Sequence, residues 1–175
     1  MRILIAGILG GVAMYIWASA AHLSPLATVG AHPVPNQGLV TAGLQLSLGD
    51  KGGVYIFGAA PAAKGSAAGP AGMIAYDPHG AAAGPQPRQL VTELVLELVE
   101  AVLLAFALAA VAGFGRRVGI AVLVGLIAAI TTNASYWNWY GFGLDYTLAN
   151  GFIELVKYVV AGVVAAAVMG RRAAG

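Results

Sequence analysis

Four long apolar runs, separated by polar or glycine- and proline-rich stretches, dominate the pattern of the sequence. The runs cover residues 3–21, 90–114, 118–134 and 148–169. An α-helix rises about 1.5 Å per residue, so about 17–25 apolar residues cross a hydrocarbon core about 30 Å thick. The pattern therefore predicts four transmembrane helices at these positions.

The segment between the first two runs, residues 22–89, has a different pattern. Asn36 precedes a stretch with an imperfect apolar face at 37–48, which predicts a short helix with Asn36 as its N-terminal cap. Two short runs, 54–57 and 73–76, predict β-strands bounded by turns. The predicted fold is an all-α membrane protein, a four-helix transmembrane bundle with a small cap between its first and second helices.

Basic residues lie at the ends of the runs that share one side of a four-span protein. Arg2 precedes the first run, an arginine pair at 116–117 separates the second from the third, and another pair at 171–172 follows the fourth. Cytoplasmic loops carry an excess of lysine and arginine, so we expect both termini in the cytoplasm. The cap and the turn at 135–146 are then extracytoplasmic.

The first run also has features of a secretory signal peptide. A basic residue, Arg2, precedes it, and Ala18, Ser19 and Ala20 resemble the small-residue pattern of a cleavage site. We expect this segment to remain in the protein as an uncleaved membrane anchor.

Composition supports the membrane class and excludes several others. Apolar residues make up 59% of the chain and charged residues 9%, with a mean hydropathy of +0.82, whereas soluble domains carry about 25% charged residues. The net charge of +2 comes from scattered basic residues, so no nucleic-acid partner is expected. Without cysteine there is no thiol nucleophile or disulfide, and no phosphate-loop, zinc or hydrolase motif indicates a cofactor.

Three glutamates inside the second run are its most unusual feature. Glu93, Glu97 and Glu100 follow an i, i+4, i+7 spacing, which places them on one stripe of a helix. A charge at the centre of a membrane span costs about 2.5–3.5 kcal/mol, so such acids need a partner, a proton or a hydrated cavity. We therefore expect this stripe to face the neighbouring helices.

A lysine in the fourth run offers a partner for one of these acids. Counted inward at 1.5 Å per residue, Glu100 lies about 15 Å and Lys157 about 14 Å below the same surface. The matching depth and opposite charge predict a buried ion pair between the second and fourth helices. Glu154, three residues before Lys157, can share the same ammonium.

The two remaining acids, Glu93 and Glu97, allow three interpretations. Glu93 can lie among lipid headgroups while Glu97 is protonated or hydrogen-bonded to another helix. A proton relay can instead run from His22 through Glu97 to Glu100. A metal site of carboxylates with His22 fits less well, because Glu-x-x-x-Glu differs from the Glu-x-x-His repeats of di-metal bundles.

Aromatic residues gather in the predicted turn before the fourth run. The cluster consists of Tyr136, Trp137, Asn138, Trp139, Tyr140 and Phe142, followed by Asp145. Tryptophan and tyrosine are enriched at the membrane–water interface, so the cluster can simply anchor this turn. It can also form a binding platform for a quinone headgroup, a lipid or a protein, with Asn138 and Asp145 as polar contacts.

Two G-x-x-x-G pairs are present, which permit helices to approach closely. Gly7 and Gly11 lie in the first run, and Gly115 and Gly119 at the start of the third. Because glycine is frequent in the chain (25 residues), either pair can reflect composition alone.

The order of features resembles an uncharacterised group of bacterial four-span integral membrane proteins. The resemblance is carried by Trp17, His22, Pro25-Leu26, Pro35-Asn36 and the Tyr-Trp-Asn-Trp-Tyr-Gly-Phe sequence at 136–142. Gly143 stands where a proline is expected in that group. The resemblance implies the four-span architecture and a location in the bacterial cytoplasmic (inner) membrane, and it implies no activity.

Two classes of function fit these observations. The small size, the slight cap and the absence of a cofactor motif favour an accessory or structural subunit of a larger membrane complex, in contact with lipid and with another protein or a second copy. The alternative is a proton-coupled transporter or a membrane enzyme that uses Glu93, Glu97 and Glu100. No proline-broken span or inverted repeat supports a transporter, so the accessory function is preferred and enzyme activity is not expected.

Overall fold

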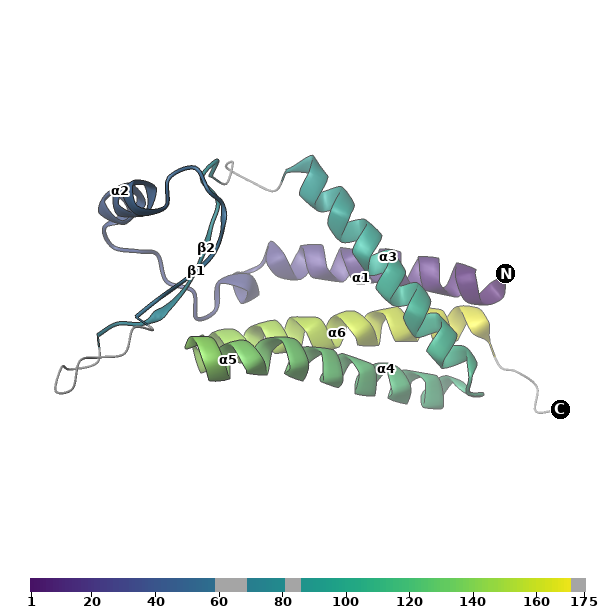
Figure 1. Cartoon of the computed structure of the whole chain (residues 1–175). Coiled ribbons are helices and arrows are strands. Elements are labelled where there is room, and N and C mark those ends of the chain that lie inside the picture. The colour runs from purple at the N-terminus through teal and green to yellow at the C-terminus, as the bar shows by residue number, and fades with distance from the viewer. Residues whose placement is uncertain (59–68, 81–85, 171–175) are drawn as a thin grey trace. The chain divides into compact units, whose positions relative to one another are not determined.

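The computed structural model describes residues 1–58, 69–80 and 86–170. The chain forms two compact units. The helical unit comprises Met1–Ala31 and Gln86–Gly175, and the small unit comprises His32–Pro85. Figure 1 shows long helices in the former and a short helix with a β-hairpin in the latter.

The helical unit is built from long helices. They are α1 (Arg2–His22), α3 (Pro87–Ala109), α4 (Phe114–Ala129) and α6 (Leu144–Met169). A π-helical segment, η2 (Ile130–Ala134), joins α4 to α5 (Ser135–Tyr140) without a break. Among the described residues, α1, the continuous helix Phe114–Tyr140 and α6 are long and apolar enough to cross a membrane. The second predicted span, the 23-residue α3, is not among these three helices, because it contains Arg88 and the three glutamates.

The helices pack in the order α3, α1, α6, α4. The main interfaces are α1 with α3, α1 with α6 and α4 with α6, whereas α3 and α4 contact each other little. Figure 1 shows α1, α4 and α6 side by side and α3 crossing them obliquely. Along α1, Gly10 contacts Ala161 of α6, whereas the later residue Trp17 reaches the earlier residue Ile153. The two helices therefore run in opposite directions. Neighbouring helices in this order are therefore antiparallel.

Glycines bring α1 unusually close to α3. A Cβ atom on Gly7 would lie 2.7 Å from the Cα of Val102, and one on Gly11 would lie 2.8 Å from the Cα of Leu98. Any larger side chain would push the two backbones apart. The first G-x-x-x-G pair is therefore a packing contact, while Gly115 and Gly119 have nothing within 4 Å and are not.

Small residues dominate the buried core of the helical unit. The core cluster is Ala6, Met14, Ala101, Leu104, Ala105, Leu108, Ala121, Ala161, Ala165 and Met169. Larger apolar side chains such as Ile16, Leu103 and Leu123 are more than half exposed, at 62%, 65% and 60%. Small residues at helix contacts and large apolar ones outside are the pattern of helices packed in lipid.

The small unit has the elements that its sequence predicts. Helix α2 covers Gln37–Leu48, and strands β1 (Gly53–Phe57) and β2 (Gly72–Tyr76) pair antiparallel. The Tyr76 hydroxyl donates a hydrogen bond of 3.0 Å to the Gly49 carbonyl, which ties the hairpin to the end of α2. One prediction is wrong in detail, because Asn36 occupies the N-cap position but its side chain makes no capping hydrogen bond.

No residue of the small unit is buried among those that the structure describes. Its large apolar side chains are among the most exposed in the chain, including Leu39 (76%), Leu46 (89%) and Ile56 (68%). A two-stranded sheet without a buried face is marginally stable in water. The unit therefore offers apolar surface that it does not cover itself.

The second predicted run ends earlier than its hydropathy indicates. The sequence predicts a helix over 90–114, but α3 ends at Ala109 and a turn precedes α4. Gly113, the N-cap residue of α4, has a φ of +91°, a conformation that a helix does not contain and that glycine adopts without strain. The surrounding residues are apolar, so hydropathy alone does not reveal this break.

The turn predicted at 135–146 is much shorter in the structure. Residues up to Tyr140 are helical, and α6 begins at Leu144. The polar side chains just before the aromatic cluster do not interrupt the helix, because Thr131 and Asn133 bond back to carbonyls of their own helix. Gly141, with a φ of +75°, ends it.

Candidate functional site

Lys157 on α6 lies at the centre of a cluster of acids. Its Nζ is 3.2 Å from Glu100 Oε2, 3.2 Å from Glu154 Oε1 and 4.0 Å from Glu97 Oε1. The ion pair between Glu100 and Lys157 predicted from matching depth is therefore present, and Glu154 shares the ammonium as expected. The Tyr158 hydroxyl adds a hydrogen bond of 3.2 Å to Glu100 Oε2. We call Glu97, Glu100, Glu154 and Lys157 the acidic cluster.

Helix geometry explains why these side chains meet. Glu97 and Glu100 are three residues apart on α3, and Glu154 and Lys157 are three residues apart on α6, so each pair shares one face of its helix. Both helices pack against α1, with α3 at Gly7 and Gly11 and α6 at Gly10, and both run antiparallel to it. They therefore run parallel to each other, which brings the two faces to the same level.

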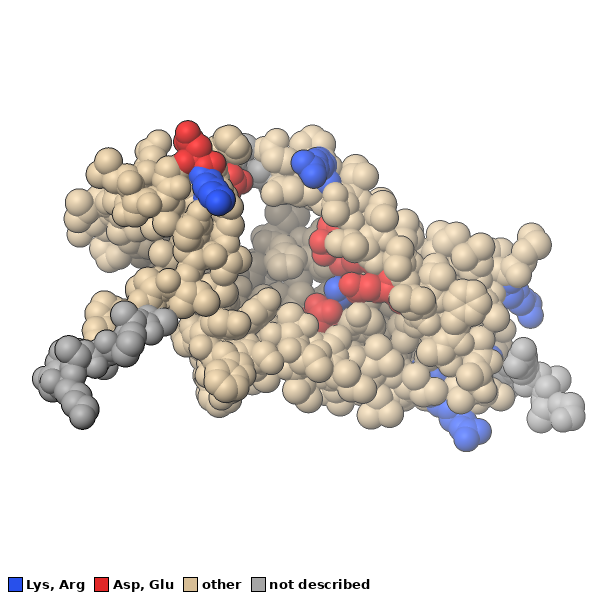
Figure 2. Space-filling view, in the orientation of Figure 1, with Lys and Arg blue, Asp and Glu red and all other residues tan. Residues whose placement is uncertain are grey.

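The acidic cluster has a closed side and an open side. The Glu97 side chain is 1% exposed, whereas the side chains of Glu100 and Glu154 are 35% and 26% exposed. Figure 2 shows acidic side chains, in red, gathered around a basic side chain, in blue, on the surface of the helical unit. On the open side, the carboxylates of Glu100 on α3 and Glu154 on α6 are therefore partly exposed at the surface.

Charge in the cluster is unbalanced. Three carboxyl groups surround one ammonium group within 4.0 Å. Neither carboxyl oxygen of Glu97 has a hydrogen-bond partner among the described residues. Buried polar groups are nearly always hydrogen-bonded, so the absence of a hydrogen bond to Glu97 is the main anomaly of the site.

The other residues predicted with this stripe lie apart from the cluster. Glu93, one turn before Glu97, is exposed, and so is His22 at the end of α1. In the described part of the chain, neither forms an ion pair or hydrogen bond with the cluster, so His22 does not contact Glu97 directly. The stripe faces inward at Glu97 and Glu100 alone. No group of three or more metal-ligating side chains is arranged around a metal position among the described residues.

Four rings in and beside the aromatic cluster contact one another. Tyr136 stacks on Phe142 at 5.4 Å and contacts Tyr140 at 5.8 Å, and Phe142 contacts Tyr146 at 5.4 Å. These rings form a row around the turn that precedes α6.

The two tryptophans of the cluster, Trp137 and Trp139, are exposed. Trp139 is 77% exposed and Trp137 is 48% exposed. Asn138 and Asp145 are exposed as well, and the Asp145 carboxylate accepts a hydrogen bond from the Tyr146 backbone N–H at 2.9 Å. This part of the predicted binding platform is free at the surface, as an interfacial anchor also requires.

Arg117 is a structural residue that the sequence does not reveal. Its guanidinium is buried, with Nε 3.1 Å from the Val111 carbonyl oxygen and 3.3 Å from that of Leu108, and with Nη1 2.7 Å from that of Gly170. These carbonyls lie at the C-terminal ends of α3 and α6, where helices leave acceptors unpaired and carry partial negative charge. Arg117 therefore links three helices. The only signal in the sequence was its position beside Arg116 after a glycine-containing turn.

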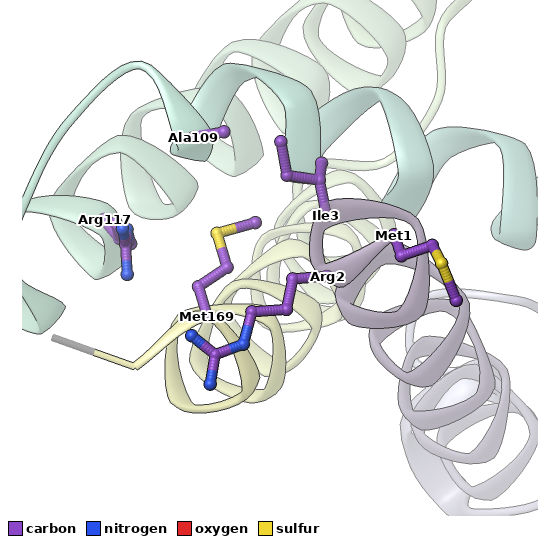
Figure 3. Close-up of a pocket in the computed structure, with 6 residues that line it drawn as sticks. All are labelled: Met1, Arg2, Ile3, Ala109, Arg117 and Met169. Carbon is purple, nitrogen blue, oxygen red and sulfur yellow. The ribbon is translucent and has the colours of Figure 1, made fainter. Parts of the chain in front are cut away.

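A pocket of about 270 Å³ lies at the same end of the helical unit. Its lining comes from the start of α1 and from α3, α4 and α6, and Figure 3 shows these side chains: Met1, Arg2, Ile3, Ala109, Arg117 and Met169. Arg2 and Arg117 thus lie at the same end of the helical unit, as expected if the basic residues beside the apolar runs share one side of the membrane. The pair at 171–172 lies outside the described residues.

Trp17 fixes α1 to α6 close to the acidic cluster. Its indole N–H donates a hydrogen bond of 3.0 Å to the carbonyl of Ile153, the residue before Glu154, and its ring meets Phe152 edge to face at 6.4 Å. In the sequence, Trp17 is notable only as one of the residues that carry the resemblance to bacterial four-span proteins.

Comparison of the chain with protein-family models, with curated proteins and with solved structures finds no match.

Proposed function

We propose that the protein is a four-span integral membrane protein in which α3 is the fourth span. At 23 residues α3 is about 35 Å long, enough to cross a bilayer core. Its alternation in direction with α1 and α4 fits four crossings. Glu97 and Glu100 lie within 4.0 Å of the Lys157 ammonium, which offsets part of the cost of placing these acids in the membrane.

This topology gives the molecule a defined orientation. Arg2 and Arg117 lie at one end of the helical unit, which the positive-inside rule assigns to the cytoplasm. The small unit, inserted between α1 and α3, is then extracytoplasmic. The resemblance to bacterial four-span proteins supports the inner membrane as its location.

We propose that the protein acts as an accessory subunit whose acidic cluster docks a helix of a larger membrane complex. The observation that carries this proposal is the open side of the cluster, where Glu100 and Glu154 are 35% and 26% exposed. A charge facing lipid at mid-membrane depth costs about 2.5–3.5 kcal/mol. A helix of another protein packed over Glu100 and Glu154 would remove the contact of these carboxylates with lipid.

The excess of carboxyl groups in the acidic cluster indicates which kind of partner is complementary to it. Its carboxyl groups outnumber its single ammonium, so a partner helix with a lysine or arginine at this depth is complementary. A second copy of this chain, packed through the same face, would bring further acids against the first. We therefore propose a different protein as the partner.

The small unit supports the same function. Leu39, Leu46, Val54 and Ile56 expose apolar surface, at 76%, 89%, 65% and 68%. Exposed apolar patches often mark protein–protein contacts. An extracytoplasmic part of the partner is a suitable cover for them.

Site-specific photocrosslinking tests the proposed docking face. Leu96 and Leu103 lie one turn before and one turn after Glu100 on α3 and are 52% and 65% exposed, and Ile16 on α1 is 62% exposed and serves as control. A photoreactive amino acid is placed at each position and activated in native membranes. Covalent adducts to one other protein from Leu96 and Leu103, but not from Ile16, support docking at this face.

Charge variants sharpen the experiment. Changing both Glu100 and Glu154 to Gln removes the excess acid, and we expect this variant to lose the adducts. Adducts to lipid alone at all three positions would overturn the proposal, and adducts between copies of this chain would replace the heterologous partner with a homo-oligomer.

A further inference from the structure

Glu97 differs from the other acids of the cluster in three ways. It is buried, neither of its carboxyl oxygens has a hydrogen-bond donor in the described part of the chain, and its nearest cation is 4.0 Å away. That cation, the ammonium of Lys157, already contacts Glu100 and Glu154 at 3.2 Å each. Glu97 is therefore the acid farthest from the ammonium of Lys157, the one cation of the cluster.

The groups that face Glu97 disfavour a further negative charge there. On its own helix these are Glu100 and, one turn away and exposed, Glu93, and from α6 they are Glu154 and Lys157. The Tyr158 hydroxyl donates its hydrogen bond to Glu100 instead of Glu97. Lys157 alone is a cation.

The remaining neighbour, α1, supplies no charged or hydrogen-bonding group to Glu97. It packs Gly11 against the Glu97 backbone. Tyr15 and His22, the titratable residues that follow Gly11 on α1, make no hydrogen bond or ion pair with Glu97 in the described part of the chain. An ionised carboxylate without a donor is far costlier to bury than a neutral carboxyl group.

We propose that Glu97 is a proton-binding site that holds its proton in the arrangement described here. With a proton on Glu97, the cluster has one carboxylate more than it has ammonium groups, and loss of the proton leaves two in excess. Proton exchange thus changes the charge of the face that the proposed function assigns to docking. The inference rests on the proposed membrane position of α3 but needs no partner protein.

Release of the proton would also rearrange the cluster. An ionised Glu97 competes with Glu100 and Glu154 for Lys157, since its Oε1 is within 4.0 Å of the ammonium. Movement of Lys157 toward Glu97 would free the two outer carboxylates. Glu97 is thereby a proton-controlled switch for the outer side of the cluster.

Infrared spectroscopy of the purified full chain in lipid bilayers at neutral pH tests the proposal directly. We expect a carbonyl stretching band of a protonated carboxyl group, shifted in D₂O, that is absent in the Glu97→Gln variant. The matched Glu93→Gln variant changes an exposed acid one turn away and keeps the band. A band that persists in Glu97→Gln, or that is absent from the parent chain, overturns the proposal.

Thermal unfolding provides a second readout that does not depend on spectral assignment. Glutamine has the size and neutrality of a protonated glutamate, so we expect Glu97→Gln to leave the unfolding midpoint unchanged. Glu100→Gln loses an ion pair with Lys157 and should lower the midpoint. A midpoint for Glu97→Gln as low as that of Glu100→Gln, or failure of this variant to fold, contradicts a neutral Glu97. Neither result depends on whether photocrosslinking finds a partner.

Discussion

The ammonium of Lys157 on α6 lies 3.2 Å from the carboxylate of Glu100 on α3, and it also contacts Glu154 on its own helix. One basic residue therefore stabilises two acids and connects α3 to α6. Replacing one partner of such a group destabilises the fold more than replacing every member, because it leaves charges in the helical unit without a counter-ion.

The first prediction concerns this group of charges. Lys157→Leu leaves Glu100 and Glu154 without a cation, and we expect the free energy of unfolding to fall by about 3–5 kcal/mol. Chemical unfolding in a mild detergent measures the loss. The double change of Glu100 and Lys157 to Leu should recover part of it, and the triple change that also replaces Glu154 should recover most. A triple variant no more stable than Lys157→Leu would show that the ion pairs are not the source of the loss.

The second prediction concerns the contact between α1 and α3. A valine at Gly11 places its Cβ 2.8 Å from the Cα of Leu98 and 3.1 Å from the Glu97 carbonyl oxygen, so α3 must move. We expect Gly11→Val to lower the free energy of unfolding by about 1–3 kcal/mol. Gly119→Val is the matched control, since nothing lies within 4 Å of that position. Equal losses in the two variants would mean that close helix approach at Gly11 is unimportant.

The third prediction compares two adjacent arginines. Arg117 donates hydrogen bonds to the ends of α3 and α6, whereas Arg116 is exposed. We expect Arg117→Leu to reduce the free energy of unfolding by about 1.5–3 kcal/mol, the range for hydrogen bonds to a charged group. Arg116→Leu removes the same charge from the same end of the protein and should have little effect. A similar loss in both variants would point to net charge as the cause.

Some features of the fold and site follow from the sequence because they depend on length and local pattern. The depth of Glu100 and Lys157 is set by counting residues along each helix, and the two residues do pair. The helix at Gln37–Leu48 and the two strands follow from apolar spacing and flanking turn residues. Such properties need no knowledge of which helix packs on which.

Other features depend on tertiary packing and are not visible in the sequence. The two G-x-x-x-G pairs look alike, but only Gly7 and Gly11 meet another helix. Arg116 and Arg117 are adjacent, and a rotation of about 100° per residue decides which one points inward. The exposure of Glu93 also depends on tertiary packing, because it is set by the point at which α3 separates from the neighbouring helices.

The central claim is that α3 crosses the membrane and carries its acids into the helix bundle. Because the chain has no cysteine, single cysteines can report on each side of this helix. Leu46 lies in the small unit before α3, and Gly115 lies at the start of α4 after it, and both are exposed.

Labelling with a membrane-impermeant thiol reagent tests this claim most directly. In cells that express the protein, with the outer face of its membrane accessible to the reagent, we predict labelling of Leu46→Cys at once and of Gly115→Cys only after the membrane is permeabilised. Labelling of both residues from the same side would contradict the account, because α3 would then not cross the membrane.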